Sequence, residues 1–314
     1  MNQQQISSKV LISKVLFFVF LACILFFSLS PSIALALGLF IGLLFTNPFS
    51  KPSKFITKYL LQLSVVGLGF GMHFDQVMAA GKDGFVFTIL TISAAMGLGF
   101  LLGRLLKVDR IISYLISCGT AICGGSAIAA ISQVMDADEK DISVSIGTIF
   151  ILNAIALFIF PPLGHFFHLS QQQFGIWAAI AIHDTSSVVG AATHYGDEAL
   201  QVATTVKLAR TLWIIPLILL TSIVFKKQSS ASVFPYFILF FIIASVINSY
   251  TTAIPAALTQ QILKFSKIGF SVTLYLIGMG ISVKAIKEVG ARPLLQGVLL
   301  WIFIIITSLF FIIH

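Results

Sequence analysis

Long apolar runs separated by short polar or charged stretches repeat along the whole chain. A helix that crosses a bilayer needs about 20 predominantly apolar residues, and eleven segments approach that measure. The predicted helices cover about residues 15–30, 32–47, 56–74, 84–103, 110–135, 142–164, 173–195, 199–225, 233–250, 266–283 and 293–313. The pattern therefore predicts an all-α, polytopic membrane protein with about eleven transmembrane helices.

Two of these segments contain polar residues deep within apolar sequence. Residues 123–126 interrupt the segment 110–135, and residues 183–187 interrupt the segment 173–195. Aligned without gaps, Ala-Ile-Cys-Gly-Gly-Ser in the first matches Ala-Ile-His-Asp-Thr-Ser in the second. Paired interruptions of this kind mark binding sites in transporters, and Asp and Ser are favoured helix N-caps. Both helices are therefore predicted to be broken near mid-membrane, at about residues 119–125 and 183–187.

A half-helix that begins inside a membrane has a chemical consequence. It exposes backbone amide donors and the positive end of its dipole, which together make an anion site, provided that the irregular backbone lines a cavity. The alternative is a Gly/Ser kink that only allows close helix packing. Because His183 and Asp184 would be costly at membrane depth without a function, the binding-site interpretation is favoured.

Two cations in the segment 199–225 support an anion site. Lys207 and Arg210 are three residues apart, so they share a helix face, although Lys207 could instead extend toward the membrane surface. Beside them, Asp184 is either a counter-ion or a proton carrier. His183 is the other candidate proton carrier, since imidazole titrates near neutral pH. Asn153 is either a hydrogen-bond partner at the site or a structural link between helices.

These arguments define one predicted substrate-binding set. Its members are Cys123, Gly124, Gly125, Ser126, Asn153, His183, Asp184, Thr185, Ser186, Ser187, Lys207 and Arg210. No enzyme, metal site or cofactor is predicted. Cys118 and Cys123 lack the further nearby ligands of a zinc site. His183, Asp184 and Ser186 are too close in sequence to face one another as a catalytic triad.

Composition and charge agree with a membrane protein and predict its orientation. Charged residues make up 10% of the chain, against about 25% in soluble domains. The net charge of +8 does not indicate nucleic-acid binding, because the basic residues are scattered between apolar runs and act as topology signals. They predict a cytoplasmic N-terminus and an extracytoplasmic C-terminus, with Lys107 and Lys226 inside and Asp138 and Asp197 outside.

The predicted orientation also suggests an internal repeat within one domain, 1–314. If the helix at 15–30 is peripheral, the other ten form halves at about 32–164 and 173–313. These halves run in opposite directions, as in the 5+5 inverted repeats of many transporters. That pairing matches the segment 110–135 with 266–283, whereas sequence similarity matches it with 173–195. The pairing of the repeats is left open.

At the residues of both interruptions the sequence resembles the YeiH-like family of bacterial inner-membrane proteins, often labelled sulfate exporters. The stretches 118–130 and 183–192 carry the resemblance, and 67–72 and 278–280 fit it as well. The chain is more remotely similar to bile-acid/sodium symporters and cation/proton antiporters, which have crossed, broken helices between two repeats. The resemblance implies an inner-membrane secondary transporter that exports a small inorganic anion, sulfate- or sulfite-like, with proton or cation coupling.

The implied partners are the anion and the lipid bilayer, and assembly into a homo-oligomer is left open. The alternative function is an anion channel or a membrane sensor that binds a ligand without transporting it. A coupled carrier needs a titratable group at its site, which His183 and Asp184 supply, whereas a passive pore does not need one.

Overall fold

The computed structural model describes residues 3–45, 47, 49–72, 74–75, 85–225, 236–251, 254–283, 287 and 289–313. Within these ranges every regular element is helical and there is no strand. The all-α prediction is therefore confirmed. Lys226, whose predicted cytoplasmic position is part of the charge argument for topology, lies outside the described residues.

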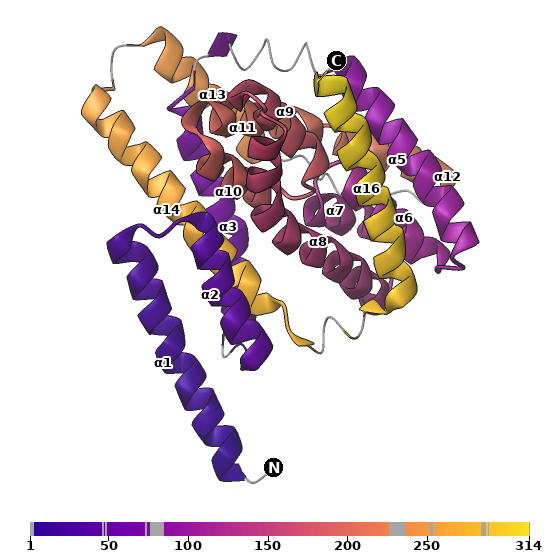
Figure 1. Ribbon diagram of the computed structural model, residues 1–314, viewed down its shortest axis with the longest axis horizontal. Helices are drawn as coiled ribbons and strands as arrows, with labels where there is room; N and C mark the ends of the chain where they lie inside the picture. Colours follow the sequence, from indigo (N-terminus) through magenta and orange to yellow (C-terminus); the bar gives the residue numbers. More distant parts are fainter. Residues whose placement is uncertain are drawn as a thin grey trace. The chain divides into compact units, whose positions relative to one another are not determined.

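The helices form two compact units, each built from two separate stretches of the chain. Unit 1, residues 1–77 and 236–283, contains α1 (Gln3–Phe27), α2 (Pro31–Leu44), α3 (Ser50–Gly69), α13 (Tyr236–Tyr250) and α14 (Ala256–Gly280). Unit 2, residues 78–235 and 284–314, contains α5 (Phe85–Leu105), α6 (Arg110–Ala121), α7 (Gly125–Met135), α8 (Glu139–Phe166), α9 (Gln171–Ala181), α10 (Thr185–Tyr195), α11 (Asp197–Thr211), α12 (Ile214–Val224) and α16 (Ala291–Ile313) (Figure 1). Both predicted sequence halves contribute to each unit, and the repeat pairing stays a prediction.

Helix length and apolarity identify a polytopic membrane protein. Within the described residues, five stretches are long and apolar enough to cross a membrane: Thr88–Leu105, Lys140–Phe166, Asp197–Val224, Ala256–Gly280 and Ala291–Ile313. Four shorter apolar helices cover Leu11–Phe27, Pro31–Leu44, Phe55–Gly69 and Tyr236–Tyr250. Together with the interrupted pairs α6/α7 and α9/α10, these account for each of the predicted segments.

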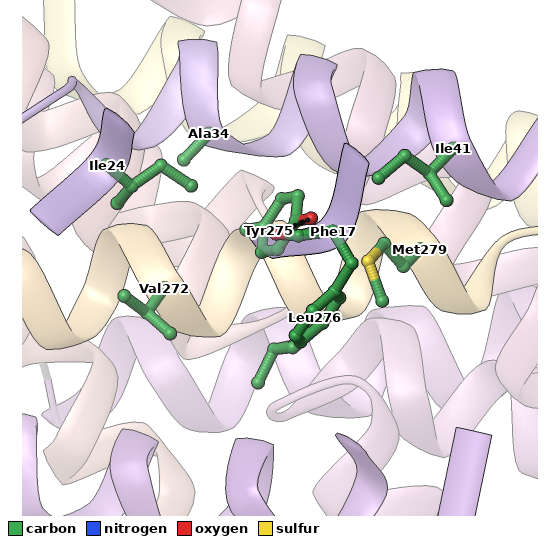
Figure 2. Packing of buried hydrophobic residues seen from close by; sticks show 8 residues of the cluster. All are labelled: Phe17, Ile24, Ala34, Ile41, Val272, Tyr275, Leu276 and Met279. Atoms are coloured by element: carbon green, nitrogen blue, oxygen red, sulfur yellow. Dashed lines mark hydrogen bonds between the residues drawn. The ribbon is translucent and has the colours of Figure 1, made fainter. Parts of the chain in front are cut away.

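Unit 1 is held together by α14, which packs against α1, α2 and α3. Its core joins Phe17 and Ile24 of α1, Ala34 and Ile41 of α2, and Val272, Tyr275, Leu276 and Met279 of α14 (Figure 2). The Tyr275 hydroxyl donates to the Phe17 carbonyl at 3.0 Å. Glycines let α2 and α14 approach closely, since a Cβ at Gly278 would lie 2.6 Å from the Leu35 carbonyl oxygen. Such small-residue contacts are typical of membrane helix pairs.

Several predicted helix ends in the described residues differ from the structure, most of all the starts of α1, which begins at Gln3 and not at about 15, and of α14. The helix predicted at 266–283 begins at Ala256, because polar residues in its first turns hid a helix that Pro255 precedes. It continues through Gly278 and ends at Gly280, so that glycine pair marks a helix end. The helix predicted at 199–225 changes at Leu212–Trp213 to i→i−3 bonds, such as Trp213 N to Arg210 O at 3.1 Å. Pro216 lacks the N–H that would bond to the Leu212 carbonyl.

In unit 2, the helices α8, α11 and α16 pack against the two interrupted helices. α8 packs against α6, α7 and α10, and therefore lies beside both interrupted helices. α11, which carries the two cations, packs against α9 and α10. α16 contacts α5, α6, α8 and α9. Residues from four parts of the sequence thereby meet at the two breaks.

Candidate functional site

Both predicted interruptions are confirmed. α6 ends at Ala121 and α7 begins at Gly125, while α9 ends at Ala181 and α10 begins at Thr185. The intervening triplets, 122–124 and 182–184, occupy equivalent places in the two aligned motifs. The second break lies slightly earlier than predicted, because Thr185, Ser186 and Ser187 form the first turn of α10.

Gly124 brings the two breaks together. It has φ +62° and ψ −127°, a conformation that essentially only glycine adopts. A Cβ at this position would lie 3.4 Å from the Cα of Asp184 and 3.2 Å from the Cγ2 of Ile149. Gly124 itself offers no capping side chain, and in the first turn of α7 the Ala127 amide faces the Cys123 thiol. The Gly125 and Ser126 amides, at the start of α7, are the donors that an anion would use there.

Gly124→Ala is expected to lower the free energy of unfolding by about 1–3 kcal/mol, the cost of holding a non-glycine residue in such a conformation. Thermal stability in detergent measures the effect. Gly97→Ala is the matched control, because Gly97 lies within α5 and a Cβ there meets nothing within 4 Å. Equal stability of the two variants would contradict a strained break at Gly124.

Asp184 caps the second half-helix and links it to α8. Its Oδ2 accepts hydrogen bonds from the Ser186 amide at 3.0 Å and from the Ser186 hydroxyl. The Asp184 amide in turn donates to Asn153 Oδ1 at 3.2 Å. The capping role inferred for Asp184 is therefore present, and Asn153 is one of its direct partners.

Lys207 binds both breaks at once. Its Nζ donates to the carbonyl of Ile122 at 3.0 Å and to that of Ile182 at 2.8 Å. These two carbonyls are equivalent in the aligned motifs, and each follows the last residue of a half-helix, where the dipole is negative. One ammonium therefore ties α6 and α9 together at their C-terminal ends.

Arg210 completes the same arrangement one turn along α11. Its Nε donates to the Ala121 carbonyl at 2.8 Å, and its Nη1 donates to Thr91 Oγ1 at 2.9 Å. Lys207 and Arg210 are 0% and 1% exposed, so the alternative that Lys207 extends outward is wrong. Neither cation forms an ion pair with Asp184 among the described residues. A direct counter-ion role for Asp184 therefore finds no support.

Several buried groups at the breaks lack hydrogen-bond partners. In the described residues these are Thr120 Oγ1, Asn153 Nδ2, both ring nitrogens of His183, and Arg210 Nη2. Two further atoms without a partner in the described residues are Ser32 Oγ and Gln296 Oε1. Neither residue takes part in the contacts at the breaks that are described above. Buried polar groups are nearly always hydrogen-bonded, so a cluster of exceptions points to a missing water, ion or ligand.

The other predicted residues are partly dispersed. Cys123 and Ser187 are buried, whereas Ser126 is exposed although it lies in the first turn of α7. That an anion lies between the backbone amides at Ser126 and Ser187, facing Lys207 and Arg210, stays a prediction. No group of three or more His, Cys, Asp or Glu side chains in the described part of the chain is arranged to hold a metal ion.

Sequence reasoning missed three contributors. Thr91 accepts from Arg210, and Thr120 adds an unpartnered hydroxyl beside the first break. Trp301 donates from Nε1 to the Ala181 carbonyl at 3.0 Å, and its ring lies 6.3 Å from that of His183. Each is a single residue in an apolar helix, so no local pattern distinguishes it.

The family follows from comparison with known proteins. The model of a family described as conserved hypothetical protein 698 matches residues 10–297. The chain belongs to this YeiH-like family. UPF0324 membrane proteins from Bacteroides thetaiotaomicron and Porphyromonas gingivalis are both 50% identical to it, over 284 and 287 residues, covering 90% of this chain and 86% and 87% of the relatives. One from Vibrio vulnificus is 45% identical over 297 residues, 93% of this chain and 95% of the relative.

No solved structure matches the chain. The membership of the YeiH-like family confirms the resemblance inferred from the two motifs, and it covers both of them as well as Lys207 and Arg210. The relatives' names describe membrane proteins, in agreement with the apolar helices of this chain.

Proposed function

We propose that this YeiH-like protein is a secondary transporter that exports a small inorganic anion, sulfate- or sulfite-like, across the inner membrane with proton or cation coupling. One observation carries the proposal: two buried cations and two interrupted helices meet at a centre that contains a single carboxylate among the described residues. Polar and charged groups buried in a membrane protein commonly mark a substrate or ion pathway.

The charge balance of this centre favours an anion. Among the described residues, the buried Lys, Arg, His, Asp and Glu side chains are Lys207, Arg210, His183 and Asp184. With Lys207, Arg210 and Asp184 taken as ionised and His183 as neutral, the formal side-chain charges are +1, +1 and −1, a sum of +1. The half-helix ends contribute about half an elementary charge each; two are negative and two positive, so they cancel. A bound anion would neutralise the surplus.

Transport by purified protein in proteoliposomes tests the proposal. Uptake of sulfate, sulfite, hydrogen carbonate and small carboxylates is measured with and without a pH gradient. We expect saturable uptake of an inorganic anion that increases with one direction of the gradient. Uptake that ignores the gradient would indicate an anion channel, and binding without uptake would indicate a sensor. Either result would replace the coupled-carrier proposal.

The proposed orientation places the N-terminus in the cytoplasm, the C-terminus outside and Asp138 and Asp197 outside. Single cysteines are introduced after Cys23, Cys118 and Cys123 have been replaced. An impermeant reagent added to intact cells should label cysteines at 138 and 197, but not those at 107 and 226. Labelling at position 107 or 226 without labelling at 138 would overturn the eleven-span orientation.

A further inference from the structure

The centre at the two breaks retains unused hydrogen-bond donors. Lys207 has three N–H donors, of which two bind carbonyls and the third has no partner among the described residues. Within the described ranges, Arg210 Nη2 and Asn153 Nδ2 also lack partners, and their side chains are 1% and 4% exposed. These groups suit the oxygens of an anion.

The same centre also retains unused acceptors. Asp184 uses Oδ2 for its cap, and no partner of Oδ1 is present in the described residues. His183 is 1% exposed, and neither of its ring nitrogens has a partner in the part of the chain that the structure describes. A neutral imidazole carries one donor and one acceptor nitrogen. A ligand whose oxygens can only accept hydrogen bonds would give Asp184 Oδ1 and the acceptor nitrogen of His183 no donor. They would stay unpaired or face the negative charge of the ligand, and both arrangements are unfavourable.

The surplus positive charge of the centre independently limits the charge that a ligand can carry. A singly charged anion neutralises the sum of +1 at the centre. A doubly charged anion would leave one uncompensated negative charge in a buried place, which is strongly unfavourable. Ligand charge and hydrogen-bond capacity therefore select the same kind of molecule.

We propose, resting on the anion transport proposed above, that the ligand is a singly charged oxyanion that still carries a proton. Hydrogen sulfite, hydrogen carbonate and dihydrogen phosphate belong to this class, whereas sulfate does not. The ionised oxygens accept from Arg210, Asn153 and Lys207. The ligand hydroxyl donates to Asp184 Oδ1 or to His183. The proton then crosses the membrane on the ligand itself.

Anion binding to the purified full-length protein, measured by calorimetry, tests this inference. Phosphate and sulfite change from singly to doubly charged near neutral pH, whereas sulfate and nitrate keep their charge. At mildly acidic pH we expect phosphate and sulfite to bind at least about tenfold more tightly than sulfate or nitrate. This preference should disappear at mildly alkaline pH. Because sulfate and nitrate keep their charge, any change of their affinity with pH comes from the protein's own titratable groups. At the centre these are Lys207, Arg210, Asp184, His183 and Cys123.

Asp184→Asn sharpens the test. The asparagine keeps one oxygen for the cap, but it replaces the free acceptor oxygen with an NH2 donor. It also removes one negative charge, so the sum of buried charges rises by one. We expect the ratio of phosphate to sulfate affinity at acidic pH to fall by about tenfold or more. Asp138→Asn is the control, since Asp138 is an exposed N-cap whose side chain makes no capping bond. If the unaltered protein binds sulfate as tightly as phosphate at mildly acidic pH, the inference is wrong, whereas the proposed anion transport is not contradicted. Absence of binding and uptake for every anion would overturn both.

Discussion

Lys207→Met is expected to weaken anion binding by at least about tenfold, which corresponds to about 1.4 kcal/mol. A unit charge pair at about 4 Å is worth roughly 4 kcal/mol at an effective dielectric constant of 20, so this is a lower bound. The substitution also removes the donor of two buried carbonyls, Ile122 O and Ile182 O. The free energy of unfolding should fall by about 1–3 kcal/mol for each carbonyl left unsatisfied.

Calorimetry with the anions and thermal unfolding in detergent separate the two effects of Lys207→Met. Lys264→Met is the matched control, because it removes the same charge from an exposed position on α14. Arg210→Met removes the other buried cation and should also weaken the anion by at least about tenfold. Unchanged anion affinity in the double variant would contradict an anion site at the two breaks.

Asp184→Asn is expected to leave α10 intact and to preserve or increase the affinity for sulfate. The asparagine oxygen can still accept from the Ser186 amide, while the sum of buried charges rises from +1 to +2. Asp184→Ala removes the cap and should cost about 0.5–2 kcal/mol of stability. Circular dichroism and thermal unfolding report the helix, and calorimetry reports the anion.

The same variant separates an anion carrier from a cation carrier. A site for a cation would need the only carboxylate found among the buried charged side chains of the described residues. In a cation carrier, Asp184→Asn would abolish binding of the cation, and Lys207→Met would leave that binding unchanged or improve it. Loss of all ligand binding in Asp184→Asn, with α10 still folded, would therefore exclude the proposed anion transport.

The interrupted helices were the part of the site that the sequence predicted best. Both breaks were located to within a few residues because their causes are local. Gly124 adopts a conformation that excludes side chains, and Asp184 satisfies a free amide two residues ahead. Neither effect depends on contacts that are distant in sequence. Helix type was equally local, since each span follows from an apolar run of sufficient length.

The partners of the two cations were not predictable in the same way. Spacing placed Lys207 and Arg210 on one helix face and suggested that they point toward an anion. Their observed bonds are to main-chain carbonyls of Ala121, Ile122 and Ile182. A carbonyl at a helix end has no side-chain signature, because every residue type carries one.

Sequence alone determined the membrane class, the helical architecture, the family, the two breaks and the residues that are expensive to bury. These properties depend on local backbone preference and on the cost of polar groups in lipid. Only the tertiary structure decided that one ammonium joins equivalent carbonyls of both breaks, that Ser126 and Ser187 differ in exposure, and which donors and acceptors remain unused. Those facts depend on how distant helices pack, and packing is set by the whole chain at once.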